Sequence, residues 1–504
     1  MKKIISIIMV AIVLVTMVAV PASAQVAYYG YSYNAWKQSV PAPTGYMPDN
    51  YYSGTSLGVG DFSKPQDFFI GPDDVMYVTD TGNNRIVMLD ADMNHIGTID
   101  SMTYNGETIT FNQPEGMFVH KNGSIYVADT GNKRVIVANP DLTVRGFIVK
   151  PEGDEIYEQT DELLPIRVFA DNAGIVYILS RSNNKGILTF DESGKFLSYY
   201  GTAKVQVTAE VVARAFWERF WSDDMAEQAT SNTPVEYKSI HISNDGFIYA
   251  TQYVSSYNNV NQLKKLNPKG VNIAKQRRRY YADIGNSNLV LGDSEIRIVG
   301  NTRTGNNFTD TVTNADSTML FLLDTAQQKI FAYDGDFNFL YVFGASGKTN
   351  GQQLGTFLSA TAVEVRGTTV YVLDSEDGSI TTFKQTTFGE LVEEGIQLYN
   401  LGEYEAAIEP WTEVLKLDSN YDVAYISLSR AAYEAGDFEK ALEYAELAYD
   451  RDSYENAYIE VRTAFLKENF GILFAIVAVI IVILIALPAL KKIKFKKKTA
   501  GGDR

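Results

Sequence analysis

A stretch of strand-like sequence occurs twice in this chain at an interval of 49 residues. Residues 62–87 contain Phe-Ser-Lys-Pro followed by Tyr-Val-Thr-Asp-Thr-Gly-Asn-Asn-Arg-Ile-Val, and residues 111–136 contain Phe-Asn-Gln-Pro followed by Tyr-Val-Ala-Asp-Thr-Gly-Asn-Lys-Arg-Val-Ile. A fixed interval of this length indicates repeated sheet units, which must pack on one another to bury their apolar faces. The repeat therefore constrains the architecture of the chain closely and its chemistry much less.

Strand patterns continue beyond this pair with weaker motifs. The marker position near the end of the second strand of each unit recurs at residues 80, 129, 180, 251, 324 and 374, with spacings of 49, 51, 71, 73 and 50 residues. Two of the six units therefore carry insertions of about 20 residues. Short strands separated by polar turns are the pattern of propeller blades. The sequence predicts a mainly β fold, with a six-bladed β-propeller over residues 61–387.

The repeated turn motif offers charged residues that resemble a site. Its residues are Asp80, Gly82, Asn83 and Arg85 in the first unit, and Asp129, Gly131, Asn132 and Arg134 in the second. A single active site needs one set of residues, whereas a turn geometry is needed in every blade. Glycine tolerates positive φ, and Asp and Asn bond turn backbone. We therefore interpret these eight residues as structural.

Two segments of the propeller region need a separate explanation. The sixth unit lacks an outer strand, and we expect the Tyr-rich stretch 27–34, within an N-terminal segment 25–60, to close the ring. The insertion at about 207–228 has apolar residues at helical spacing and predicts an amphipathic helix. Either it caps its own blade, or it binds a partner or covers a site.

From residue 388 the period changes to 34 residues, which predicts paired helices over 388–469, the last of them a capping helix. Small and aromatic residues recur at this interval and let the helices approach closely. The structural positions are Gly395, Gly402, Tyr404, Ala407, Gly436, Phe438 and Ala441.

Both chain ends carry membrane-related signals. Residues 1–24 have the charged, apolar and small-residue regions of a signal peptide, with an uncleaved anchor as the alternative. Residues 471–490 are uncharged and long enough for a transmembrane helix, and the basic tail 491–504 is expected in the cytoplasm. The sequence predicts a single-pass cell-membrane protein with extracytoplasmic N-terminal domains.

Charge and composition exclude several function classes. The chain carries a net charge of −17, and without the +2 of the signal peptide and the +6 that follows residue 470 the exported part carries about −25. Such a surface repels nucleic acid, whose binding depends on phosphate neutralisation. The chain has no cysteine, which excludes disulfides, thiol catalysis and thiolate metal sites.

The motifs at residues 62–87 and 111–136 resemble the NHL-repeat β-propellers, and the likeness weakens towards residue 383. Residues 389–453 resemble tetratricopeptide (TPR) repeats, although Ser419 and Ser453 stand where that family usually has proline. The order of signal peptide, NHL propeller, TPR repeats and C-terminal anchor is similar to that of bacterial membrane-anchored NHL-repeat proteins.

Related six-bladed propellers include lyases and lactonases that hold a divalent metal in the central channel. The resemblance offers two weak metal candidates, Glu115 and His241, and further inner-strand carboxylates at Asp67 and Glu364. The three histidines occupy different repeat positions, so they do not converge as a three-His site would. We predict no catalytic residues and no cofactor, with calcium or zinc only in the alternative of an exported metal-dependent lactonase or lyase.

The sequence therefore predicts a membrane-anchored extracytoplasmic binding or scaffold protein rather than an enzyme. The propeller is expected to bind a ligand or partner, and the TPR module a protein at the membrane or cell surface. A glycan or small ligand at the propeller face is the alternative for the Tyr-rich surface. No nucleic-acid partner is expected.

Overall fold

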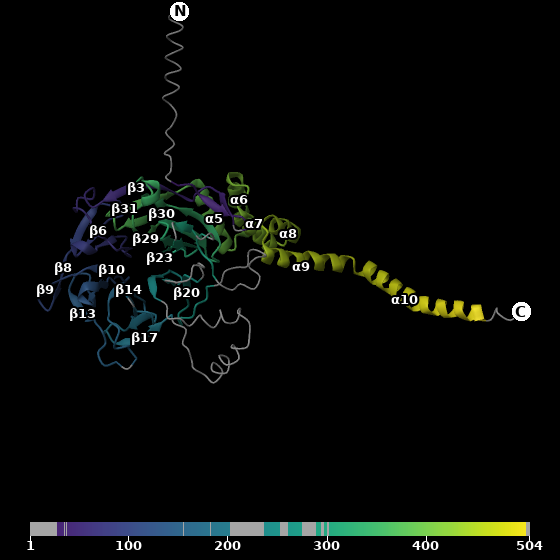
Figure 1. The fold of residues 1–504 in the computed structure, drawn as a ribbon, viewed down its shortest axis with the longest axis horizontal. Helices are drawn as coiled ribbons and strands as arrows, with labels where there is room; N and C mark the ends of the chain where they lie inside the picture. Colours follow the sequence, from purple (N-terminus) through teal and green to yellow (C-terminus); the bar gives the residue numbers. More distant parts are fainter. Residues whose placement is uncertain are drawn as a thin grey trace, which may run out of the picture.

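The computed structural model describes residues 28–499 apart from 35, 37, 155, 182, 202–235, 253–260, 275–288, 294–296, 300 and 301. The expected signal peptide 1–24 and helical insertion 207–228 lie outside the described residues. The described chain forms a ring of sheets with helices beside it and a long helix leading away (Figure 1).

Six antiparallel sheets form the six predicted blades. Blade 1 comprises β4 (Asp67–Ile70), β5 (Met76–Asp80), β6 (Arg85–Leu89) and β7 (His95–Ile99). Blade 2 comprises β10 (Pro114–Val119), β11 (Ile125–Asp129), β12 (Arg134–Ala138) and β13 (Val144–Ile148). Blade 3 comprises β14 (Pro165–Ala170), β15 (Val176–Ser180), β16 (Ile187–Phe190) and β17 (Phe196–Tyr200). Blade 4 comprises β18 (Tyr237–Ile242), β19 (Ile248–Gln252) and β20 (Leu263–Leu266). Blade 5 comprises β23 (Phe308–Thr313), β24 (Met319–Asp324), β25 (Lys329–Asp334) and β26 (Phe339–Phe343). Blade 6 comprises β29 (Ala360–Arg366), β30 (Thr369–Asp374), β31 (Ser379–Gln385) and β3 (Tyr46–Ser53).

Short elements decorate the ring. They are the hairpins β1 (Tyr31–Tyr33) with β2 (Ser39–Pro41), β8 (Ser101–Tyr104) with β9 (Glu107–Thr110), and β21 (Arg297–Val299) with β22 (Thr302–Thr304); the pair β27 (Ala345–Ser346) and β28 (Thr356–Phe357); the 3-10 turns η1 (Thr81–Asn83) and η2 (Thr130–Asn132); and α4 (Gly347–Asn350).

Burial explains why each blade has apolar middle strands. Every residue of β5, β11, β15, β19 and β24 is buried, because neighbouring blades cover both faces of these strands. The innermost strands β4, β10, β14, β18, β23 and β29 contact one another in this order, and β29 contacts β4. The ring is therefore closed around a central channel.

The ring is closed from within the expected segment 25–60, but not by the Tyr-rich stretch 27–34. Strand β3 pairs antiparallel with β31 over Tyr46↔Gln385 to Ser53↔Ser379 and completes blade 6. The Tyr-rich stretch 27–34 instead contributes β1, which pairs with β2 and packs on β26 of blade 5. Its three-residue strand is too short to cover the seven-residue edge of β31, whereas the eight residues of β3 cover it completely.

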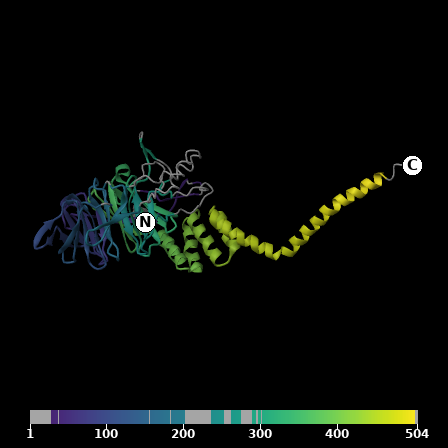
Figure 2. The ribbon, with the colours of Figure 1, turned by 90° about the horizontal axis from the view of Figure 1, so that it is seen from below.

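The propeller is followed by a row of helices that comprises α5 (Thr387–Asn400), α6 (Tyr404–Leu417), α7 (Asp422–Glu434), α8 (Phe438–Leu447) and α9 (Arg451–Glu468). Each packs against the next. Figure 2 shows them side by side at one edge of the propeller.

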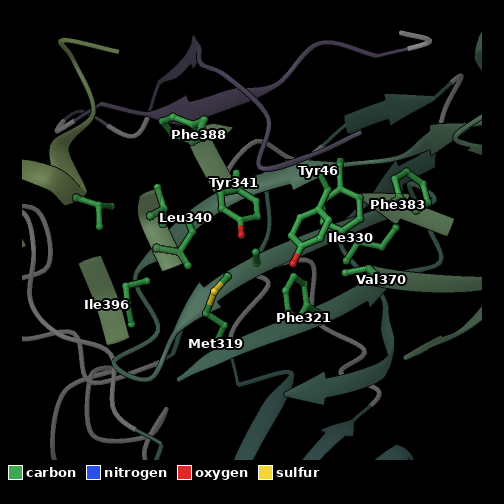
Figure 3. Close-up of a cluster of buried hydrophobic side chains, with 14 of the residues drawn as sticks. Tyr46, Met319, Phe321, Ile330, Leu340, Tyr341, Val370, Phe383, Phe388 and Ile396 are labelled. Atoms are coloured by element: carbon green, nitrogen blue, oxygen red, sulfur yellow. The ribbon is translucent and has the colours of Figure 1, made fainter. Parts of the chain in front are cut away.

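Helices α5 and α7 share a hydrophobic core with blades 5 and 6. Phe388 and Ile396 of α5 lie over Leu340, Tyr341 and Met319 of blade 5 (Figure 3). The ring of Phe388 lies 6.4 Å from that of Tyr341, measured between centroids. Propeller and helices therefore form one packed body.

Helix α10 (Phe470–Thr499) continues from α9 and leads away from this body (Figures 1 and 2). Within the described part of the chain, Phe470–Pro488 is a segment long and apolar enough to cross a membrane, with a mean hydropathy of 3.4 and no burial against the rest of the protein. The predicted anchor 471–490 coincides with this segment.

Candidate functional site

Polar side chains from all six inner strands gather in the central channel. They are Asp67 (β4), Glu115 (β10), Arg167 (β14), Ser239 (β18), Asp310 (β23) and Glu364 (β29). Five of the six strands have a register shift near their first residues. A bulge of this kind re-aims a side chain, and here it brings groups from different repeat positions together.

Arg167 is the centre of this channel cluster. Its Nη1 lies 2.6 Å from Asp67 Oδ2, although the two residues belong to blades 3 and 1. The guanidinium reaches Asp67 past Gly116 of blade 2, where a Cβ atom would lie 2.5 Å from the carbonyl oxygen of Ile166. Gly116 therefore leaves the space in which blades 1 and 3 connect.

The carboxyl groups around Arg167 hold protons more tightly than usual. Burial raises the pKa of Asp67 to about 7, although Arg167 opposes the shift. Burial also raises the pKa of Asp310 and, much further, that of Glu364. Burial acts to lower the pKa of Arg167. The surrounding carboxylates, of which Asp67 has the largest effect, outweigh burial and raise this pKa. Burial is the largest cause of each carboxyl pKa shift, and neighbouring carboxylates add to it for Asp67 and Glu364.

Asp310 is held by two hydrogen bonds. Its Oδ1 accepts from Ser239 Oγ at 2.5 Å and its Oδ2 from the backbone N–H of Val363 at 2.8 Å. These bonds connect blades 4, 5 and 6, as Arg167 connects blades 1 and 3. The cluster thus ties the inner strands together across the channel.

The structure does not bring the two sequence-derived metal candidates together. Glu115 Oε2 forms an ion pair with Arg181 Nη2. His241 Nε2 accepts from the backbone N–H of Thr313 at 3.3 Å, and burial lowers the pKa of this imidazole to about 4. Within the described ranges, no three His, Asp or Glu side chains are placed to hold a metal ion. The calcium or zinc of the lactonase or lyase alternative stays an untested prediction.

Sequence reasoning singled out Asp67, Glu115 and Glu364 but missed Arg167, Asp310 and Ser239. The repeat motif is degenerate in blades 3 to 5, so no repeated residue types identify these positions. The available signal was positional: each stands two residues after the residue that opens its inner strand, as in Pro165–Arg167 and Phe308–Asp310.

The repeated turn residues form the same contacts in blades 1 and 2. Buried Asp80 accepts from the backbone N–H of Ser63 at 2.7 Å, from Asn83 Nδ2 at 2.8 Å and from Arg85 Nε at 2.7 Å. Asp129 accepts from the Asn112 N–H at 2.7 Å, from Asn132 Nδ2 at 2.9 Å and from Arg134 Nε at 2.8 Å, which repeats the pattern.

Glycine is needed at the centre of each turn. A Cβ atom at Gly82 would lie 2.4 Å from Ser63 Oγ, and one at Gly131 would lie 2.6 Å from Asn112 Cγ. The turn thus holds the loop before the inner strand close to the 3-10 turn that follows the second strand. We call this turn the latch, because it holds one loop against another. The structural role of the eight residues stays a prediction, which stability measurements can test.

The helical positions taken from the 34-residue period are equivalent in space. Gly402 and Gly436 follow α5 and α7, each with φ +81°. Tyr404 and Phe438 begin α6 and α8, and their rings lie 5.2 and 5.3 Å from Tyr399 and Tyr433.

Small residues let the helices of each pair approach. Ala407 and Ala441 are buried. A Cβ atom at Gly395 would lie 2.5 Å from the ring of Trp411. The two helix pairs are therefore built alike.

The comparisons with known proteins agree with the repeat. The model of the NHL repeat family matches residues 111–137, which comprise β10, β11 and most of β12 in blade 2. A comparison with curated protein sequences finds no match.

Solved structures of other proteins are similar to the chain at low identity. Virginiamycin B lyase from Staphylococcus aureus is 11% identical, with 66% of this chain and 98% of that chain covered and a TM-score of 0.39. Hydrazine synthase from Kuenenia stuttgartiensis is 11% identical, with 68% and 99% covered and a TM-score of 0.39. The Cps50 (Swd1) β-propeller domain from Myceliophteria thermophila is 8% identical, with 68% and 100% covered and a TM-score of 0.38.

Proposed function

We propose that this protein is a membrane-anchored extracytoplasmic binding or scaffold protein. The observation that carries the proposal is the shared core of the propeller and the helices, which makes one body that ends in a membrane-compatible helix. A protein built in this way presents a fixed surface at a membrane. The signal-like residues 1–24 and the basic tail 491–504 support an extracytoplasmic body and a cytoplasmic tail.

We propose further that α5 to α8 are two TPR repeats. The equivalent turns, small residues and ring contacts at a 34-residue interval support this assignment. The C-terminal helices would then serve as the protein-binding module of the scaffold.

The propeller already occupies the face that α5 and α7 present together. Tyr421 Oη donates to the carbonyl oxygen of Leu340 at 2.9 Å, Arg430 Nη1 lies 3.1 Å from Asp336 Oδ2, and Asn314 Nδ2 donates to Glu393 Oε1 at 2.9 Å. A peptide or helix from a partner cannot displace these contacts without undocking the helices. The partner-binding surface must therefore lie elsewhere on the module.

Helix α9 offers the surface that fits this requirement. Only Ser453 and Ala457 of α9 are buried, while Tyr458 and Ile459 are 45% and 47% exposed. The helix stands at the end of the module and leads directly into α10. A membrane protein beside the anchor would meet this surface first.

Site-specific crosslinking in native membranes tests the proposal. A photoreactive amino acid replaces Tyr458 in the full-length protein, and the same residue at Tyr51, on β3 of the propeller, serves as the control. We expect a defined membrane or cell-surface protein as an adduct at position 458 and not at position 51. Adducts with lipid or with second copies of the chain alone would overturn the proposal.

A further inference from the structure

A cleft of about 810 Å³ lies between the N-terminal hairpin β1–β2, blade 5 and the turn that joins α6 to α7. Its lining includes Tyr29, Tyr31, Tyr33, Asp293, Lys329 and Asp418. Pockets for small ligands usually occupy about 300–1,000 Å³. The cleft is separate from the central channel and its charged cluster.

The walls of this cleft are held in place from both sides. The rings of Tyr31 and Tyr33 lie 6.5 and 5.6 Å from that of Phe339 in blade 5. Beyond β1, the ring of Trp36 lies 5.4 Å from that of Tyr449, which follows α8. The hairpin thus bridges propeller and helices, and a wall fixed before binding reduces the ordering cost of a ligand.

The floor of the cleft carries charges that neutralise each other. Lys329 Nζ lies 3.2 Å from Asp293 Oδ2 and donates to Tyr31 Oη at 2.9 Å. Tyr33 Oη donates to Asp293 Oδ1 at 2.7 Å. Burial acts to raise the pKa of Asp293, but Lys329 and the tyrosine hydroxyls outweigh it, so the carboxyl stays ionised beside the ammonium group. The floor therefore has no net charge to attract an ionic ligand.

The wall above this floor is aromatic and apolar. Tyr29 is 84% exposed at the cleft, and Val40, Pro41 and Pro43 contribute aliphatic surface. Hydroxyl, ammonium and carboxylate groups lie within the same cleft, so donors and acceptors stand close to apolar faces. A ligand that matches both carries no negative charge, is rich in hydroxyl groups and has one flat face that can stack on a ring.

We propose that this cleft binds a neutral oligosaccharide. The proposal rests on the extracytoplasmic binding function and names the ligand class of one of its surfaces. Tyr29 stacks on the apolar face of a sugar ring, while Ser39 and the Lys329–Asp293 pair bond its hydroxyls. Asp418 at the α6–α7 turn adds a carboxyl at the cleft, which disfavours acidic sugars.

Calorimetric titration of the full-length protein in phospholipid nanodiscs tests the assignment. Maltoside detergents are avoided, because their headgroups are themselves neutral oligosaccharides. The probes are maltohexaose, cellohexaose and mannohexaose, and a hyaluronan hexasaccharide is the acidic counterpart. We expect at least one neutral probe to bind and to bind more tightly than hyaluronan.

Matched tyrosine variants locate the site. Tyr29→Ala should weaken binding of the neutral probe at least tenfold, because it removes the ring on which the sugar stacks. The substitution should leave the fold intact, because the Tyr29 side chain is largely exposed. Tyr51→Ala, at a 48% exposed tyrosine on blade 6, should leave the affinity unchanged.

Three results would overturn the assignment: none of the neutral probes binds, hyaluronan binds more tightly, or Tyr29→Ala binds as the parent does. The crosslinking of a protein at position 458 is independent of this titration. A failure of the oligosaccharide assignment therefore leaves the scaffold proposal standing, and a failed crosslink leaves the titration interpretable.

Discussion

Replacing Arg167 with methionine removes the cation of the channel cluster and keeps a side chain of similar length. The Arg167 and Asp67 side chains are 12% and 10% exposed, so their ion pair is buried. Loss of one partner from a buried pair leaves an uncompensated charge and costs about 3–5 kcal/mol of unfolding free energy. We expect the loss of unfolding free energy in Arg167→Met to lie in this range at pH 8.

The cost of this substitution should depend on pH. Asp67 has a pKa of about 7 in the folded protein against an ordinary value of 3.8, so the folded state binds more protons than the unfolded state between these values. This group therefore destabilises the fold increasingly as pH rises through the window from about 4 to 7. Without Arg167 the carboxyls hold their protons to still higher pH. Arg167→Met should be mild at pH 5, where Asp67 is protonated, and severe at pH 8.

Urea unfolding of the full-length protein in a non-ionic detergent, followed by tryptophan fluorescence at pH 5 and pH 8, measures both effects. Lys348→Met is the control, because the Lys348 and Glu376 side chains are 57% and 50% exposed and their ion pair contributes about 0–1 kcal/mol. A cost for Arg167→Met below about 1 kcal/mol at pH 8, or an equal cost at both pH values, would refute the account of the cluster.

Three further substitutions and one control substitution test the latch and the helical module by urea unfolding. Asp129→Ala leaves the Asn112 N–H and Arg134 without their acceptor and should cost about 2–4 kcal/mol, whereas a catalytic role would leave stability unchanged. Gly395→Val forces a side chain into the ring of Trp411 and should cost about 1–3 kcal/mol, while Gly146→Ala, with open space at its Cβ position, should cost under about 1 kcal/mol. Tyr421→Phe removes one bond between helix and propeller and should cost about 0.5–1.5 kcal/mol.

The number and order of the blades could be read from the sequence, because each middle strand must be apolar on both faces. The positions 80, 129, 180, 324 and 374 end their strands in the structure, and position 251 is one residue from the end of β19. The prediction that the stretch 27–34 is the closing strand was wrong. Aromatic content favours a strand, but it does not determine which sheet edge that strand joins. That choice depends on edge length and on where the chain returns, which only the assembled ring defines.

The channel cluster was only partly predictable for a different reason. Glu115 directly follows a proline, whereas Arg167 stands two residues after one, so the two occupy different repeat positions. The register shifts in β10 and β14 bring both towards the channel. A bulge is a property of strand pairing, so the offset of a residue from the start of its strand becomes informative only once the pairing is known.

Hydrogen bonds among three residues connect the start of the closing strand to the start of the first docked helix. Thr44 accepts from Thr386 Oγ1 at 2.8 Å, and the carbonyl oxygen of Gly45 accepts from the Thr386 N–H at 2.9 Å, just before β3 starts at Tyr46 and α5 at Thr387. Thr386 also caps α5 by accepting from the Gly389 N–H at 3.1 Å.

This junction couples the two parts of the body energetically. A Cβ atom at Gly45 would lie 2.3 Å from the ring of Tyr341, which is also part of the core shared with α5. Gly45→Ala should therefore disturb the closing strand and the docked helix together, and both should unfold in one transition at a lower urea concentration than in the parent. Fluorescence of Trp411, within the helices, and proteolysis of the β3–β31 edge report on the two parts separately. If helices and propeller unfold at different urea concentrations in the parent protein, they are independent bodies, and the rigid platform on which the scaffold proposal depends does not exist.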